Sequence, residues 1–381
     1  MKPSTKVIHK GQRPDKETGA VIPPVYLTST YVQDAPGKFK GYDYTRAGNP
    51  NFTNIEETLA ALENAKYATA FSSGLGATTG IIASLFKHGD TILTGNDLYG
   101  GTVRLLNKIF KKFGVSFQTV NTTIQEEVKN ALQHKPKALL FETPSNPLLN
   151  ISDIEAITRI AKQYNVITIV DNTFATPYFQ NPINLGADIV FHSTTKYIGG
   201  HSDTIGGAVV TNNKTIKEKL DFTRMSIGLN PSPFDAWMIS RGVKTLAVRM
   251  EKHEKNAIAI AEYLSSHKKI KKVLYPGLTA CPKYQIAKKQ MKGFGGIVSV
   301  EFDLNINDTK KLISSFEIFS LAESLGGIES LVNHPASMTH ASISKNNRER
   351  NGLTDGLVRF SVGIEDIEDL IADLNKQLSL I

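Results

Sequence analysis

Short apolar runs alternate with segments of helical periodicity over the middle of the chain. The runs lie at 91–93, 138–141, 166–170 and 189–191. Between and around them, apolar residues at helical spacing predict helices over 55–64, 77–87, 102–113, 124–133 and 153–164. Continuous apolar strands separated by helices are typical of a parallel sheet that is covered on both faces. The pattern therefore predicts an α/β fold for this part of the chain.

The two ends of the chain follow other patterns. The first 45 or so residues are rich in turn formers and aromatic residues and show no sustained periodicity, so we expect an extended arm. A helix-rich stretch at 232–265 leads to alternating apolar and polar positions at 296–302 and 358–362, which are typical of strands. We therefore expect three parts. They are an arm over 1–48, a cofactor-binding α/β domain over 49–240 and a smaller C-terminal α+β domain over 241–381.

The composition is that of an ordinary globular protein. Of the 381 residues, 40% are apolar and 21% are charged, and this length is enough for a sizeable core and two domains. The single cysteine, Cys281, excludes an internal disulfide and a thiolate zinc cluster, and it fits a reducing, cytoplasmic compartment. No apolar leader and no apolar run near about 18 residues occurs, so we expect neither secretion nor a membrane span.

The net charge of +8 raises the question of nucleic-acid binding. The basic residues are spread along the chain, and the densest group, at 267–272, follows the expected end of a helix at Ser265. Cations stabilise a helix C-terminus, so this group is better explained as a solvated surface. We therefore expect no nucleic-acid partner, although the positive charge would attract small anionic metabolites.

A lysine with unusual neighbours follows the last apolar run. Ser193, Thr194 and Thr195 precede Lys196, and two glycines come shortly after it. A Schiff base to pyridoxal phosphate needs an amine held at the aldehyde and donors for the phosphate, and this segment offers both. An isolated lysine of this kind could also lie in a polar surface turn. The interpretation therefore depends on partners elsewhere in the chain.

Two further segments supply such partners. Asp171 directly follows the run at 166–170, where it could cap the next turn or face a pyridine nitrogen and keep it protonated. Glycines at the start of the predicted helix, in 71–76, allow the backbone to approach a phosphate. The spacing of Gly74, Gly76 and Gly80 also resembles a loose dinucleotide fingerprint. A nicotinamide-dependent oxidoreductase therefore stays as an alternative.

Three more residues fit a cofactor and an anionic substrate. Tyr99 could stack on a flat cofactor ring or be an ordinary half-buried tyrosine. Asn146 could donate to a phenolate oxygen or only hold a turn between two prolines. Arg359 lies in a predicted strand among apolar neighbours, and a buried guanidinium needs an anionic partner. Its fork shape matches a substrate carboxylate, with a structural salt bridge as the alternative.

Taken together, these residues resemble the pyridoxal-phosphate enzymes of cysteine and methionine metabolism, the transsulfuration family. Its members include cystathionine γ-lyase, β-lyase and γ-synthase. The resemblance covers most of the chain, and its motifs lie at 44–50, 170–173, 193–203, 234–237, 323–327 and 338–340. It implies a fold of the aspartate-aminotransferase type (fold type I). It also implies a homotetramer of two dimers, in which the arm crosses the dimer interface and active sites are shared.

The resemblance also assigns roles to individual residues. Lys196 would be the Schiff-base lysine and Tyr99 the stacking ring, and both would take part in catalysis. The other cofactor contacts would come from Asp171, Thr173, Gly74, Leu75, Ser193 and Thr195, with Tyr44 and Arg46 supplied by the neighbouring subunit. The amino-acid substrate would be bound by Arg359, Asn146, Ser324, Glu323, Arg104, Asp43 and Thr339.

The resemblance narrows the reaction without fixing it. Glu323 matches an acidic residue typical of members that act at the γ-carbon, and Asp43 could face the distal ammonium of cystathionine. We therefore expect a carbon–sulfur lyase that cleaves cystathionine by α,γ-elimination and also by α,β-elimination, giving a thiol amino acid, a 2-oxo acid and ammonia. A γ-synthase that joins cysteine to an O-acylhomoserine shares these residues and stays as the alternative.

Overall fold

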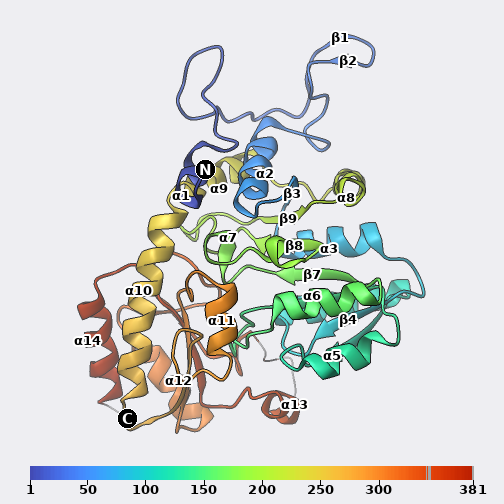
Figure 1. Ribbon diagram of the computed structural model, residues 1–381. Helices are drawn as coiled ribbons and strands as arrows, with labels where there is room; N and C mark the ends of the chain where they lie inside the picture. The colour runs from blue at the N-terminus through green and yellow to red at the C-terminus, as the bar shows by residue number, and fades with distance from the viewer. Residues whose placement is uncertain (340, 342–344, 380–381) are drawn as a thin grey trace.

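A seven-stranded sheet forms the centre of the computed structural model, which describes residues 1–339, 341 and 345–379 (Figure 1). The strand order is β3-β9-β8-β7-β6-β4-β5. The strands are β3 (Tyr67–Phe71), β4 (Thr91–Gly95), β5 (Ser116–Val120), β6 (Ala138–Glu142), β7 (Ile167–Asp171), β8 (Ile189–Ser193) and β9 (Gly207–Thr211). All four expected strands are present, and β3, β5 and β9 are additional. The predicted α/β fold is therefore confirmed for this part of the chain.

The sheet is mixed, whereas the sequence predicted a parallel one. Every pairing from β8 to β5 is parallel, but β9 runs antiparallel to both β8 and β3. The reason is the connection at 194–206, which consists of turns and bends and contains no helix. A parallel neighbour needs a crossover connection, usually a helix, so the chain reverses here. The lysine segment lies in this connection.

Helices cover both faces of the sheet, as expected. They are α2 (Pro50–Leu62), α3 (Gly74–Leu85), α4 (Gly100–Lys108), α5 (Gln125–Leu132), α6 (Ile154–Gln163), α7 (Thr176–Phe179) and α8 (Lys214–Ile227), with 3₁₀ turns at Phe110–Phe113 and Pro182–Leu185. Buried residues of α3, α4 and α8 pack on one face, and those of α2, α5 and α6 pack on the other. Residues of the inner strands alternate between the two faces, and both faces are buried, which explains the continuous apolar runs.

A second, five-stranded sheet lies in the C-terminal part, in the order β10-β11-β14-β13-β12. Its strands are β10 (Ile270–Leu274), β11 (Ile297–Phe302), β12 (Ser320–Leu321), β13 (Leu331–Asn333) and β14 (Leu357–Ser361). Helix α9 (Pro233–Val243) precedes this part and packs with α2. The helices that follow are α10 (Leu246–Ser265), α11 (Tyr284–Gln290), α12 (Ile306–Ser315), α13 (Lys345–Arg350) and α14 (Ile367–Leu378). Residues of α10 belong to both the central and the C-terminal cores, so the domain boundary at 240 stays a prediction.

The loops and the hairpin of the N-terminal arm stand away from the body of the molecule, whereas its first helix packs on the body through Val7 (Figure 1). The arm contains a short helix, α1 (Pro3–His9), and a small hairpin of β1 (Gln33–Ala35) and β2 (Lys38–Phe39), none of which the sequence pattern predicted. Between these elements, apolar side chains such as Val21, Leu27 and Val32 are exposed. An arm with this surface suits contact with another chain.

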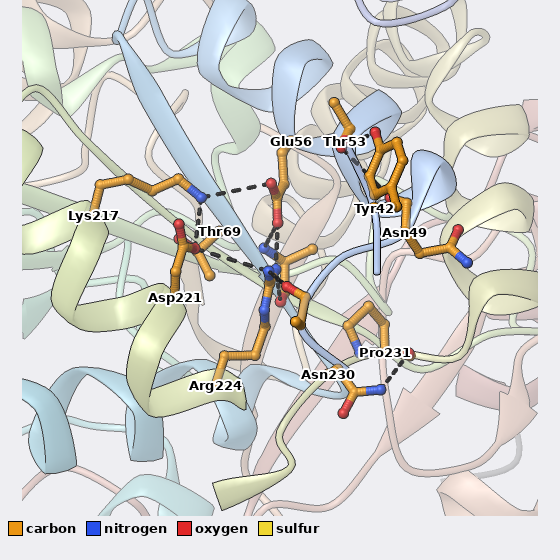
Figure 2. A network of polar contacts seen from close by, with 12 residues as sticks. Tyr42, Asn49, Thr53, Glu56, Thr69, Lys217, Asp221, Arg224, Asn230 and Pro231 are labelled. Carbon is orange, nitrogen blue, oxygen red and sulfur yellow. Dashed lines mark hydrogen bonds and ion pairs between the residues drawn. The ribbon is translucent and has the colours of Figure 1, made fainter. Parts of the chain in front are cut away.

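A buried ionic network fixes the base of the arm to the body (Figure 2). Arg224 of α8 forms an ion pair with Glu56 of α2, and its Nη2 donates to the carbonyl of Ala47 at 3.2 Å. Lys217 adds a contact with Glu56 at 3.6 Å and one with Asp221 at 2.6 Å. The end of the arm is therefore held by α8. Among the described residues, no helix is long and apolar enough to cross a membrane.

Candidate active site

A cavity of about 340 Å³ opens where β6, β7 and β8 end, and residues of the C-terminal part close its other side. Because these three strands are parallel, their carboxyl ends meet at the same edge of the sheet. The predicted residues that line the cavity are Gly74, Leu75, Tyr99, Asn146, Asp171, Thr173, Ser193, Thr195, Lys196, Glu323, Ser324, Thr339 and Arg359. His340, the last residue of one motif, lies outside the described part of the chain.

Lys196 lies in the turn that follows β8, with its side chain in the cavity. Its Nζ donates a hydrogen bond to Ser324 Oγ at 2.6 Å. Burial lowers the pKa of Lys196 from 10.5 to about 8, and the neighbouring charge of Arg359 acts in the same direction. A lowered pKa leaves more of the amine neutral near physiological pH, and the neutral amine is the nucleophile.

One end of the cavity is formed by the start of α3 and the end of β8. The side chain of Ser73 caps the helix by accepting a hydrogen bond from the backbone N–H of Gly76 at 2.9 Å. A Cβ at Gly74 would lie 2.9 Å from Cβ of Ser193, so the two segments approach as closely as a glycine allows. Hydroxyls of Ser193 and Thr195 line the cavity beside this helix N-terminus. These donors fit the phosphate of pyridoxal phosphate.

Asp171 and Tyr99 also line the cavity. Asp171 Oδ1 accepts a hydrogen bond from the backbone N–H of Thr173 at 2.9 Å, and the carboxyl makes no ion pair with any described residue. Burial raises its pKa, while hydrogen bonds from Thr173 favour the charged form. Thr173 Oγ1 in turn accepts from the backbone N–H of Ser193 at 2.9 Å, which fixes β7 to β8. A carboxylate that lacks an ion-pair partner among the described residues fits a protonated ring nitrogen, and Tyr99 is exposed enough to stack on that ring.

The other end of the cavity carries a buried cation. Arg359 of β14 is only 2% exposed; its Nη1 donates to Asn146 Oδ1 at 2.7 Å and its Nη2 to the carbonyl of Ser324 at 2.6 Å. Burial lowers its pKa from 12.5 to about 10. Within the described chain Arg359 has no carboxylate in ion-pair contact, which argues against the structural salt bridge. The site therefore leaves a guanidinium available for an anionic ligand.

Ser324 links Lys196 to Arg359. Its backbone has φ of +92°, a region that residues other than glycine rarely adopt. In this conformation its hydroxyl accepts from Lys196 and its carbonyl accepts from Arg359. Strained backbone of this kind is common where a site must be held in one geometry.

Four predicted residues lie outside the cavity of their own chain. Arg46 donates to the carbonyl of Met225 at 2.7 Å, and its guanidinium lies 5.5 Å from the ring centre of Tyr44. Asp43 Oδ1 accepts a hydrogen bond from the backbone of Tyr44, and Arg104 is exposed on α4. For these four residues, contact with cofactor or substrate stays a prediction.

Sequence reasoning assigned no role to Glu142, which also lines the cavity. It ends β6 in the same way that Asp171 ends β7, and the two residues are register partners. The rule that identified Asp171, an acidic residue directly after a buried apolar run, applies equally to Glu142. The prolines that follow it, Pro144 and Pro147, indicated a turn instead.

Comparisons with known proteins agree with this geometry. The sequence model of the Cys/Met metabolism PLP-dependent enzymes matches residues 4–379. Cystathionine beta-lyase of Lactococcus lactis subsp. lactis is 50% identical over 374 residues, which are 98% of each chain. Cystathionine gamma-lyase of Dictyostelium discoideum is 48% identical over 375 residues, 98% of this chain and 97% of the relative.

A third relative and a solved structure complete the comparison. Cystathionine gamma-synthase of Mycobacterium tuberculosis is 46% identical over 377 residues, 99% of this chain and 96% of the relative. The crystal structure of cystathionine gamma-lyase from Lactobacillus plantarum, complexed with L-serine, is 44% identical and has a TM-score of 0.96. The match covers 100% of this chain and 99% of that one. The likeness confirms the expected fold type, and three different activities occur among chains of similar identity.

Proposed function

Because the chain belongs to the Cys/Met metabolism PLP-dependent enzymes, we propose that it cleaves cystathionine, chiefly at the γ-carbon and in part at the β-carbon. With water, γ-cleavage gives cysteine, 2-oxobutyrate and ammonia, and β-cleavage gives homocysteine, pyruvate and ammonia. The observation that carries this proposal is the cavity in which Lys196, Asp171 and Arg359 lie together with the N-terminus of α3. A nicotinamide oxidoreductase would not require this lysine.

Each of the cavity residues has a separate role in this proposal. Pyridoxal phosphate, when bound, supplies an aldehyde for the substrate amine and a ring that accepts electrons from Cα. Lys196 holds the cofactor and then moves the Cα proton through its Nζ, which the bond to Ser324 Oγ orients. Asp171 keeps the ring nitrogen protonated, and Arg359 with Asn146 binds the substrate carboxylate. Tyr99 stacks on the ring and assists protonation of the leaving group.

The same proposal includes a homotetramer made of two dimers with shared active sites. Tyr44 and Arg46 lie on the arm and do not line the cavity of their own chain. Several apolar residues elsewhere on the arm are exposed. The network around Arg224 holds this segment on the body, so its side chains are presented to a neighbour (Figure 2). In this assembly Tyr44 and Arg46 complete the phosphate site of the partner.

The position of Glu323 favours γ-cleavage. Its carboxyl lines the cavity near Lys196, whose charge it helps to stabilise. An acidic group there suits the distal ammonium of cystathionine, and Asp43 of a neighbouring arm would add a second carboxylate. Cystathionine γ-synthase is the second candidate, since a relative with that name is 46% identical over nearly the whole chain.

Incubation of the purified enzyme with cystathionine alone tests the proposal. Cysteine with 2-oxobutyrate as main products and a smaller amount of homocysteine with pyruvate would support it. Absence of both a free thiol and an oxo acid would refute it. Acyl release from an O-acylhomoserine that depends strictly on cysteine would instead identify the γ-synthase.

A further inference from the structure

Two carboxyl groups lie side by side in the cavity, at the ends of neighbouring strands. Glu142 and Asp171 are register partners in β6 and β7, and both line the cavity. Register partners of parallel strands point to the same face of a sheet, so these side chains are adjacent. Glu142 is only 8% exposed. The proposed function gives Asp171 a role but leaves its neighbour without one.

Glu142 shares the cavity with Lys196 and Arg359, but among the described residues neither cation is in ion-pair contact with it. Its Oε1 accepts a hydrogen bond from the backbone N–H of Tyr99 at 2.6 Å, and the backbone N–H of Asn146 also faces it. The titratable groups that act on its pKa are the carboxyls of Asp171 and Asp97, and Glu142 makes no ion pair with any residue that the structure describes. Burial is the main cause that raises the pKa of Glu142 well above its usual value, and the charge of Asp171 adds to it.

Asp171 is the better placed of the two to hold a negative charge. Thr173 favours its charged form with hydrogen bonds, one of them from the backbone N–H to Oδ1 at 2.9 Å. The charge of His192 also lowers the pKa of Asp171, whereas the charged neighbours of Glu142 are carboxylates that raise its pKa. Two adjacent carboxyls in a cavity do not both ionise readily, because like charges at short range repel strongly. These observations favour one negative charge on the pair, held by Asp171.

We propose that Glu142 is protonated in the working enzyme and acts as a neutral positioning residue, which leaves Asp171 as the single carboxylate at the cofactor ring and holds Tyr99 in place. The inference rests on the proposed function, because it takes the role of Asp171 from there. A protonated carboxyl still accepts the Tyr99 N–H through its carbonyl oxygen. A second ionised carboxylate here would repel the carboxylate of an amino-acid substrate.

The hydrogen bond to Tyr99 matters because of where that residue lies. Tyr99 directly precedes α4, and its backbone N–H has no helical partner at that position. Glu142 supplies the missing acceptor and so ties the start of α4 to the end of β6. Glutamine has the same shape as a protonated glutamate and retains an acceptor, whereas leucine lacks one. Comparison of a glutamine variant with a leucine variant therefore distinguishes a neutral positioning role of Glu142 from a role of its negative charge.

Infrared difference spectroscopy of the holoenzyme at pH 8 tests the protonation directly. The spectrum of the wild type should contain the carbonyl-stretch band of a protonated carboxyl, and the spectrum of E142Q should lack it, so the band should appear in the difference between the two. D97N is the matched control, because burial raises the pKa of Asp97 only to about 6 and the band should survive there. Absence of the band in the wild type, or its survival in E142Q, would overturn the inference.

Kinetics test the positioning role. E142L should lose about tenfold in kcat, as expected when a hydrogen bond that orders Tyr99 is removed, and E142Q should recover most of that loss. Equal losses in E142Q and E142L would overturn the role of a neutral group. D171N is measured beside them: retention of full activity in D171N would refute the proposed role of Asp171 itself, whatever the result at Glu142.

Discussion

Replacement of Arg359 by methionine should separate substrate binding from stability. The guanidinium is buried and bonded only to the neutral oxygens of Asn146 and Ser324. Its pKa falls from 12.5 to about 10. That change corresponds to about 3 kcal/mol of unfavourable burial, which an anionic ligand would offset. Because loss of a buried charge pair with a ligand costs about 2–5 kcal/mol, both estimates agree in order of magnitude.

The expected result is therefore a large kinetic effect with little loss of stability. About 3 kcal/mol corresponds to a fall of roughly a hundredfold in kcat/KM, and most of it should appear as a higher KM. The unfolding temperature of the ligand-free enzyme should change little, because removal of a buried cation offsets the loss of the donors to Asn146 and Ser324.

Initial rates over a range of cystathionine concentrations and thermal unfolding of the free enzyme measure the two quantities. R359K is the matched control, because it keeps the charge but loses the fork that grips both carboxylate oxygens. We expect an intermediate KM for it. An unchanged KM in R359M, or a large drop in unfolding temperature with normal kinetics, would show that Arg359 is structural and would refute the reasoning.

Three further predictions concern Lys196 and the arm. K196A should lose the visible absorbance of the bound cofactor together with turnover, and normal activity in this variant would contradict the assignment. Since the pKa of Lys196 is lowered to about 8, the fraction of Lys196 in the neutral amine form rises about tenfold per pH unit below that value and levels off above it. The rate at which apoenzyme takes up pyridoxal phosphate should follow this curve; a rate that still climbs steeply at pH 10 would argue against it. R224M breaks the buried pair with Glu56 and removes the hydrogen bond to Ala47, so its subunits should dissociate at protein concentrations at which the wild type is still assembled. Sedimentation experiments measure this, and E218Q, in an exposed pair on the same helix, should assemble normally.

The sequence predicted those parts of the fold that one continuous pattern determines. The buried strands β6, β7 and β8 are apolar runs, and all were expected. In contrast, β3 and β9 consist largely of alanine, glycine, valine and threonine, and β5 lies at the sheet edge with mostly exposed side chains. Neither composition differs enough from a loop to be recognised locally. Their pairing depends on residues far away in the chain.

The residues of the site also differ in whether a local sequence pattern identifies them. Lys196 and Asp171 were predictable because polar residues directly after buried strands meet at one sheet edge. Arg359 was predictable because a charge inside an apolar strand needs a partner. The backbone of Ser324, which links Lys196 to Arg359, depends on contacts between distant segments, and no local pattern marks it. Tyr44 and Arg46 could be assigned only by resemblance, since their proposed target belongs to another subunit.

Reduction of the holoenzyme with borohydride, followed by peptide mapping, tests the central claim most directly. The account predicts one pyridoxyl group fixed to the peptide that contains Lys196, with no label on the other lysines. A label on a different lysine, or no stable label at all, would contradict it.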